Sequence, residues 1–340
     1  MVDKNIDFFQ IEDNFSQTAD VSSLPIFESK LDFIPKVTIA IPTYKRSKYL
    51  KEAIDSAINQ IEYDDFDIIV VDNDPERDCD TEKLMLMYDN QRLSYYKNAK
   101  NIQMAGNWNR LFTLSKGKYL VMLHDDDLLM PVFLKECMTV VNAEPDLGIL
   151  KPLSQSFKID ENISLESKTD NNAHKLERLY DLSNYSYYAL GAPSGCLFRK
   201  DAFVKVGGFN QEMYPTMDLC FVVLFSSYFK VYKLHKVLSI YRWGENESLQ
   251  CSTLRGFIIN DYYLRRKLLN KYKVPYWVID KYLSFLISNY ENWCKSINKE
   301  FSFDLNDLNL KKQNEYIILI YRLLIKIYLG ALLFYKRITS

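Results

Sequence analysis

The sequence lacks the glycine-rich motifs that hold phosphates in two common classes of enzyme. No GxGxxG follows the first predicted strand, and GxxxxGK[ST] occurs nowhere in the chain. A dinucleotide-dependent dehydrogenase and a P-loop enzyme are therefore disfavoured. A nucleotidyltransferase on a similar sheet would also bring a glycine-rich loop after the first strand, where this chain has PTYKRS.

Paired cysteines and an excess of one charge are also missing. The six cysteines are scattered and form no CxxC pair, which disfavours zinc and thioredoxin-like chemistry and fits reduced thiols in the cytoplasm. Lys and Arg number 43 against 44 Asp and Glu, so the net charge of -1 gives no electrostatic footprint for nucleic acid. We therefore expect no nucleic-acid partner.

Targeting and spanning segments are not evident. The N-terminal sequence MVDKNIDFFQIEDNF lacks the basic start and apolar core of a secretory signal. No uninterrupted apolar run reaches the length of a bilayer span. We expect a cytoplasmic protein, at most attached to the cytoplasmic face of the membrane.

The first half of the chain alternates apolar strands with helices. Apolar and β-branched runs predict strands over 36–43, 66–73, 93–97 and 119–123. Helical spacing predicts helices over 47–60, with Ser47 as cap, over 81–90, and over 104–116, with Gly117 just past the end. This order implies a parallel sheet with right-handed crossovers. We expect an arm over 1–35, a main domain over 36–250 and a helical region over 251–340.

Three acids follow the apolar strand at 119–123. His124 and then Asp125, Asp126 and Asp127 stand at the end of the strand, where open parallel sheets bind their ligands. Carboxylates held close together repel one another, and a bound Mg²⁺ or Mn²⁺ ion would offset that repulsion. The competing explanation is a solvated acidic turn that caps the helix starting near Pro131.

Several segments, in this order, resemble family 2 glycosyltransferases, the inverting class with the A-type nucleotide-sugar fold. They are VTIAIPTYKR, FDIIVVDND, NIQMAGNWNRLFTLSKGKYLVMLHDDDLLMP, GAPSGCLFRKDAFVKVGGFN, TMDLC and LSIYRWGENES. The resemblance covers residues 36–248 and implies an α/β fold. Its Rossmann-like, mostly parallel sheet would be flanked by helices and followed by a C-terminal helical extension.

The resemblance also implies which residues hold a nucleotide-diphospho-sugar. The base-and-ribose pocket would be lined by Pro42, Thr43 and Tyr44, with Arg46 beside it. The uracil or ribose would be bound by Asp72, and Asp125 would lie near the ribose. The helix beside the nucleotide would contribute Asn107 and Asn109. The family's Asp-x-Asp metal motif falls on His124 and Asp126, which makes Asp126 the expected ligand of Mn²⁺ or Mg²⁺. Asp127 and His124 are further candidates, although loop ordering or a structural histidine explains them as well.

The family's catalytic base falls on Asp218. The family has Glu-Asp there, and this chain has Met217 and Asp218. Asp218 could equally cap the following helix, and the two roles are compatible. A late histidine of the family is Gly244 here, and Arg242 either approaches the diphosphate or is a surface arginine. The GAPSG segment would form the floor of the acceptor pocket, and the acceptor side would lie in the polar, irregular residues 151–190.

The segment 315–337 is strongly apolar but contains Arg322 and Lys326. A spanning helix would bury both cations, whereas a helix at the membrane interface leaves them among the headgroups. The alternative is a helix packed on the catalytic domain or on another subunit.

These features together predict a metal-dependent, inverting glycosyltransferase. It would move a sugar from a nucleotide-diphospho-sugar, a UDP-sugar by preference, to a hydroxyl of a glycan or lipid-linked acceptor in lipopolysaccharide, capsule or other surface polysaccharide synthesis. The alternative is a degenerate homologue that binds nucleotide-sugar and supports a partner enzyme. The sequence leaves the donor sugar, the linkage and the oligomeric state open.

Overall fold

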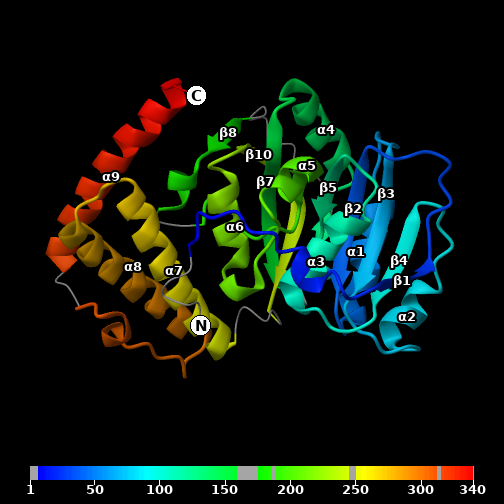
Figure 1. Cartoon of the computed structure of the whole chain (residues 1–340), viewed down its shortest axis with the longest axis horizontal. Coiled ribbons are helices and arrows are strands. Elements are labelled where there is room, and N and C mark those ends of the chain that lie inside the picture. The colour runs from blue at the N-terminus through cyan, green and yellow to red at the C-terminus, as the bar shows by residue number, and fades with distance from the viewer. Residues whose placement is uncertain (1–6, 159–174, 186–187, 245–249, 312–314, 340) are drawn as a thin grey trace.

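A central sheet runs through the molecule, with a group of helices beside it (Figure 1). The computed structural model describes residues 7–158, 175–185, 188–244, 250–311 and 315–339. The sheet has ten strands in the order β1-β4-β3-β2-β5-β9-β7-β10-β6, with β8 paired to β10. The strands are β1 (Ser23–Phe27), β2 (Val37–Thr43), β3 (Phe66–Asp72), β4 (Leu93–Asn98), β5 (Tyr119–Met122), β6 (Leu128–Leu129), β7 (Leu147–Lys158), β8 (Leu176–Leu179), β9 (Cys196–Arg199) and β10 (Lys230–Trp243).

The predicted parallel half of the sheet is confirmed. Strands β2, β3, β4 and β5 pair in parallel, and the intervening α1 (Ser47–Ile58), α2 (Asp80–Met85) and α3 (Gln103–Leu114) alternate with them. The antiparallel pairings lie outside the prediction, among them β1 with β4 and β5 with β9. The N-terminal arm thus supplies an edge strand, and β7 runs through residues that the sequence indicated as irregular.

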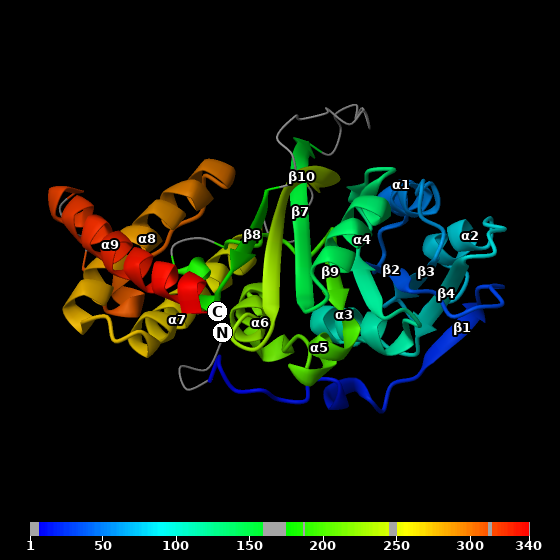
Figure 2. The same ribbon diagram turned by 90° about the horizontal axis from the view of Figure 1, so that it is seen from above.

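Helices cover both faces of the sheet (Figure 2). On one face, α1 and α4 (Phe133–Ala143) pack on alternate strand residues such as Ile39 and Val121. On the other face, α3, α5 (Lys200–Lys205) and α6 (Met217–Phe225) pack on the residues between them, such as Ala40 and Leu120. This alternation follows from the two-residue period of a strand and leaves both faces buried.

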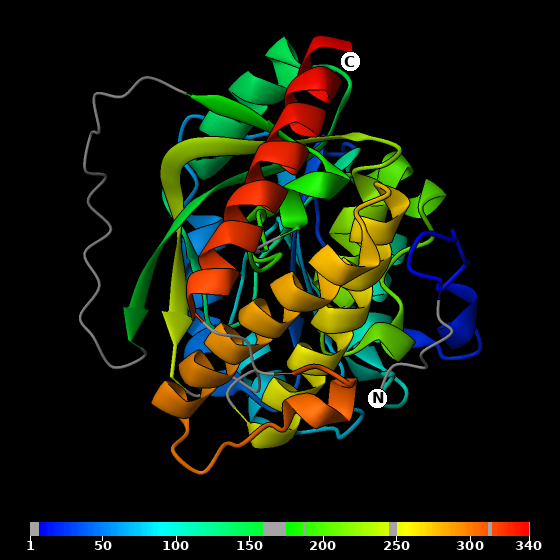
Figure 3. The same ribbon diagram turned by 90° about the vertical axis from the view of Figure 1, so that its left-hand side faces the viewer.

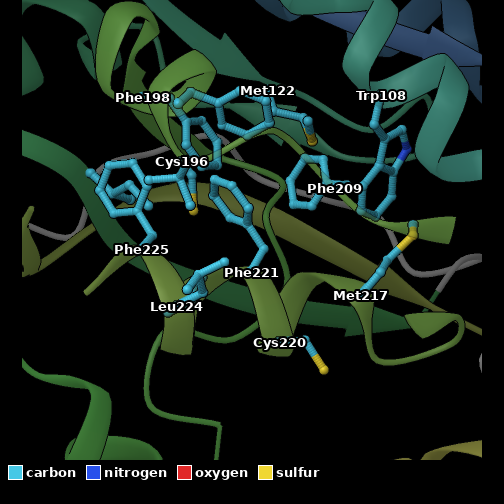
Figure 4. Close-up of a cluster of buried hydrophobic side chains, with 14 of the residues drawn as sticks. Trp108, Met122, Cys196, Phe198, Phe209, Met217, Cys220, Phe221, Leu224 and Phe225 are labelled. Carbon is cyan, nitrogen blue, oxygen red and sulfur yellow. The ribbon is translucent and has the colours of Figure 1, made fainter. Parts of the chain in front are cut away.

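The second of these cores is rich in aromatic rings (Figure 4). Phe203 of α5 stacks on Phe112 of α3 with centroids 3.4 Å apart, and its ring lies 4.6 Å from that of Phe221 in α6. Phe209 meets Trp108 edge-on at 5.2 Å. Rings from α3, α5 and α6 therefore form one aromatic layer on this face of the sheet.

The C-terminal helices form a third core. Helices α7 (Cys251–Lys271), α8 (Tyr276–Ile297) and α9 (Glu315–Thr339) pack together, with α8 in contact with both α7 and α9 (Figure 3). Helix α7 also contributes Leu264 and Leu268 to the core that contains α6. The helical extension is thereby anchored on the sheet domain through one of its own helices.

Three local details differ from the sequence prediction. Ser47 is the first residue of α1 and makes no capping hydrogen bond, because Arg46 occupies the cap position. Gly117 does not cap α3; a side chain there would collide with backbone atoms of Val37 and Thr38. Arg242 is no surface residue, since only 3% of it is exposed.

Candidate active site

The ends of β2, β3 and β5 open into a cavity of about 830 Å³. Two of its walls come from α3 and from α6, and a third comes from α7 and α8. The predicted residues that line it are Pro42, Thr43, Tyr44, Arg46, Asn107, His124, Asp125, Asp126 and Asp218. Residues far apart in the chain therefore meet at one site, as the strand-end rule for open sheets predicts.

Asp125 and Asp126 are held by a hydroxyl at the end of β2 and by a cation from the loop that follows it. Thr43 Oγ1 donates to Asp125 Oδ2 at 2.8 Å, and Arg46 Nη2 donates to Asp126 Oδ2 at 2.7 Å. Arg46 Nη1 also lies 3.5 Å from Asp125 Oδ1. Burial raises the pKa of Asp125 to about 7, and Arg46 offsets part of that rise. The loop thus fixes two carboxylates that would otherwise repel each other.

His124 lies between the aromatic layer and the acids. Its ring stacks on Trp108 with centroids 5.2 Å apart, and its Nε2 is buried with no hydrogen-bond partner among the described residues. Burial lowers the pKa of His124 to about 4. The imidazole is therefore neutral at pH 7, the form that can bind a metal ion.

His124, Asp126 and Asp127 offer three ligand atoms within 4.8 Å of one another. Asp127 Oδ1 accepts from the Arg242 backbone N at 2.9 Å, while its buried Oδ2 makes no hydrogen bond of ordinary geometry. Burial, and then the neighbouring Asp126, raise the pKa of Asp127 above its usual value. Two carboxylates and an imidazole, with His124 Nε2 and Asp127 Oδ2 making no hydrogen bond of ordinary geometry among the described residues, fit a Mn²⁺ or Mg²⁺ ion.

Asp218 lies in the first turn of α6, after the cap residue Thr216. Its Oδ1 accepts from the backbone N of Leu219 at 2.8 Å, and its half-buried side chain lines the cavity. Burial raises the pKa of Asp218 to about 6. The carboxylate is therefore ionised at neutral pH yet more basic than an ordinary aspartate.

Comparison with protein families identifies the chain. Residues 38–207, half of its length, match the family model described as glycosyl transferase family 2. The chain belongs to this family. It is a glycosyltransferase, with the mixed α/β fold that the sequence predicted.

Curated relatives agree with this assignment. A GalNAc(5)-diNAcBac-PP-undecaprenol beta-1,3-glucosyltransferase of Campylobacter jejuni is 26% identical over 80% of this chain and 90% of its own. An uncharacterized glycosyltransferase of Methanocaldococcus jannaschii is 30% identical over 38% of this chain, and that match spans 44% of the archaeal protein. An uncharacterized glycosyltransferase of Rickettsia typhi is 28% identical, and the match spans 63% of it.

Solved structures share the fold. Residues 1–349 of S. aureus TarS in complex with UDP-GlcNAc superpose with a TM-score of 0.54 at 17% identity, over 82% of this chain and 97% of that one. The mannosyltransferase PcManGT from Pyrobaculum calidifontis in complex with GDP-Man and Mn²⁺ gives 0.52 at 14% identity, over 90% and 88%. At these identities the likeness concerns the fold.

Two predicted donor residues of this glycosyltransferase lie behind the cavity wall. Asp72 is fully buried, and its Oδ2 accepts from Tyr95 Oη at 2.8 Å and from Lys97 Nζ at 2.9 Å. Asn109 holds the backbone of Phe209 through two hydrogen bonds of 2.8 Å. In their places Asn73, from the end of β3, and Trp108, from α3, line the cavity.

The sequence prediction also missed much of the cavity wall. Among the described residues of 151–190, Tyr188 alone lines the cavity; residues 159–174, which the prediction included, lie outside the described part of the chain. Ala192 and Pro193 of the GAPSG segment do line it. The remaining wall comes from α7 and α8, where the sequence carries only helical periodicity and no motif that points to a site.

Proposed function

We propose that the protein is an inverting, metal-dependent glycosyltransferase that uses a nucleotide-diphospho-sugar donor. The observation that carries this proposal is the cavity itself. His124 and Asp126 line it and, together with the buried Asp127, offer ligand atoms that suit a divalent cation. Asp218, a carboxylate suited to accept a proton, lines the same cavity. Both groups are needed for transfer by a single displacement.

Asp126, Asp127 and His124 would hold the cation. When bound, the cation stabilises the charge that develops on the departing diphosphate. Thr43 and Arg46 keep Asp125 and Asp126 in place, and Arg46 brings a positive charge to the same wall. The lining residues Pro42, Tyr44 and Asn73 would surround the base and ribose.

Asp218 would take the proton from the attacking acceptor hydroxyl. General-base assistance of this kind is typically worth roughly 10²–10⁴-fold in rate. Its pKa of about 6 keeps Asp218 ionised at pH 7 while leaving it a stronger base than a solvent-exposed aspartate. A displacement from the face opposite the leaving group inverts the anomeric carbon, so an α-linked donor would give a β-linked product.

The acceptor and pathway follow from weaker observations. The Campylobacter relative is named for transfer to an undecaprenol-linked glycan, and its match spans 90% of that protein. We therefore place this enzyme in surface polysaccharide synthesis on a glycan or lipid-linked acceptor. UDP-sugars are the first donors to test.

A thermal-shift panel of UDP-, GDP- and dTDP-sugars, each with and without Mn²⁺, tests the donor and metal proposals. A ligand at about a hundred times its Kd stabilises a protein by roughly 2.7 kcal/mol, a shift that is easily measured. We expect one nucleotide class to raise the melting temperature, and to do so more strongly with Mn²⁺. An equal shift with and without Mn²⁺ in every case would contradict the metal proposal.

Helix α9 carries an apolar stripe that we propose lies on the membrane surface. Within the described residues of this helix, the exposed stripe consists of Ile320, Leu323, Leu324, Ile327, Tyr328, Phe334, Tyr335 and Ile338, each 44–68% exposed. The helix sequence has four basic residues and one acidic residue, which suits an anionic lipid surface. No helix in the described part of the chain has the length and apolar character needed to cross a bilayer.

Flotation with vesicles containing phosphatidylglycerol tests this contact. The protein should float with the vesicles, and the double variant Leu323→Glu, Ile327→Glu should remain at the bottom of the gradient. Met87→Glu is the matched control, because Met87 is 80% exposed but lies after α2. If the protein does not float and instead elutes as a dimer that the double variant dissociates, the stripe is a protein interface.

A further inference from the structure

The cavity extends past Asp218 to the C-terminal helices. Helix α7 faces it with Thr253, Phe257, Asp261 and Arg265. Their spacing of four residues places them on one side of the helix. On α8, Leu286 and Tyr290 complete this wall. The stripe is therefore a continuous surface of the cavity, built by a region that the family model does not cover.

Asp261 and Arg265 form a nearly buried ion pair on this stripe. Arg265 Nε donates to Asp261 Oδ2 at 2.6 Å, and Arg265 Nη1 donates to the backbone O of Asn184. The side chains are 13% and 6% exposed. An ion pair held this way presents hydrogen-bonding groups whose charges are already balanced, and its geometry is fixed before any ligand arrives.

Charge and shape at this end of the cavity select one class of ligand. If Asp218 takes the proton of the acceptor hydroxyl, the acceptor lies on the side of Asp218 that faces α7. Among the described residues, the charged ones that line that side are Asp218, Asp261 and Arg265, which sum to one negative charge. Phe257 and Tyr290 add aromatic surface, which suits the apolar faces of a sugar ring.

We infer that the α7 stripe is the acceptor subsite and that Asp261, aided by Tyr290, binds the hydroxyl groups of a neutral sugar at the acceptor terminus. The inference rests on the proposed function and adds the acceptor's chemical class to it. An acceptor sugar with a carboxylate or phosphate beside its attacking hydroxyl would be repelled by Asp218, whose charge the paired Asp261 and Arg265 leave unbalanced. Asp261 is thus a residue that positions the acceptor and determines specificity.

Calorimetric titration of the full chain tests the inference. The probes are neutral octyl glycosides of glucose, galactose, N-acetylglucosamine and N-acetylgalactosamine, and octyl glucuronide as the charged counterpart, each added after UDP and Mn²⁺. We expect at least one neutral glycoside to bind and the glucuronide to bind at least tenfold more weakly. Asp261→Asn should weaken the neutral glycoside about tenfold, the value of one hydrogen bond to a charged group, and leave the affinity for UDP and Mn²⁺ unchanged.

A matched control and a milder variant accompany this test. Asp280→Asn removes an Asp–Arg pair between α8 and α7, with Arg266, that does not line the cavity, so it should change neither affinity. Tyr290→Phe keeps the ring but removes its hydroxyl, and should weaken the glycoside severalfold even if Asp261→Asn folds poorly.

The outcomes separate the inference from the proposed function. If UDP and Mn²⁺ bind but no neutral glycoside does, or if Asp261→Asn and Tyr290→Phe leave the glycoside affinity unchanged, the subsite assignment is wrong and the donor proposal stands. Glucuronide binding as tight as the neutral glycosides overturns the charge argument. If UDP does not bind with or without Mn²⁺, the proposal of a UDP-sugar donor is wrong.

Discussion

Asp218→Asn removes the proposed base while keeping the size of the side chain and an oxygen that can accept from Leu219. Transfer should fall roughly 10²–10⁴-fold at pH 7.5, the usual contribution of a positioned base. The wild-type rate should fall about tenfold per pH unit below pH 6, because protonated Asp218 cannot accept a proton. The variant should lose that acid limb, since its amide does not titrate.

The same substitution should stabilise the fold. Burial raises the pKa of Asp218 from 3.8 to about 6, so the folded chain holds this proton more tightly than the unfolded chain. The stability of the wild type therefore falls as the pH rises from about 4 to about 6. Above pH 6, Asp218→Asn should be more stable by about 1–3 kcal/mol, with the upper value given by the full shift and the lower by solvent screening.

Three measurements check this reasoning together: initial rates against pH, nucleotide affinity, and urea unfolding at pH 5 and pH 8. A base predicts lost turnover, unchanged nucleotide affinity and a gain in stability that is larger at pH 8. Unchanged turnover, or turnover lost together with nucleotide affinity, would refute the assignment of Asp218 as the base.

Other changes separate binding groups from structural ones. Chelation should abolish transfer, and added Mn²⁺ or Mg²⁺ should restore it. Asp126→Asn should lower transfer at least a hundredfold and remove the Mn²⁺-dependent thermal shift. Full activity in the presence of the chelator would refute the metal requirement and the role of Asp126 in it. Lys97→Met leaves the buried carboxylate of Asp72 without its cation, 2.9 Å away, and should destabilise the protein by about 3–5 kcal/mol in urea unfolding. A loss of less than 1 kcal/mol there would show that Asp72 does not depend on Lys97. Phe203→Ala opens the aromatic layer and should cost about 3–5 kcal/mol, where a change below 1 kcal/mol would mean that the layer repacks.

The parallel half of the fold was predictable because its signals are local. Largely apolar runs at 37–43, 66–72 and 119–122 favour burial between two layers of helices, and the polar residues that follow them then lie at one edge of the sheet. Strands β1 and β9 were not predicted, since short antiparallel strands take their register from distant partners.

The same limit applies to the site. His124, Asp125 and Asp126 follow a strand directly, so their neighbourhood was evident from the sequence. The direction of the Asp72 side chain was not, because it depends on Tyr95 and Lys97 of the next strand. The cavity wall on α7 depends on how a helix distant in the sequence packs against the sheet domain, and no local sequence pattern predicts that packing.

Three sides of helix α7 contact three different parts of the molecule. Leu264 and Leu268 pack against the sheet domain, Ile258 and Leu269 pack within the C-terminal helices, and Thr253, Phe257, Asp261 and Arg265 face the cavity. Substitutions on the third side touch neither apolar core. Residues that face the cavity from such a helix can therefore differ without disturbing either core, so a lineage of these enzymes can acquire new glycan targets by changing one helix side while the nucleotide half stays as it is.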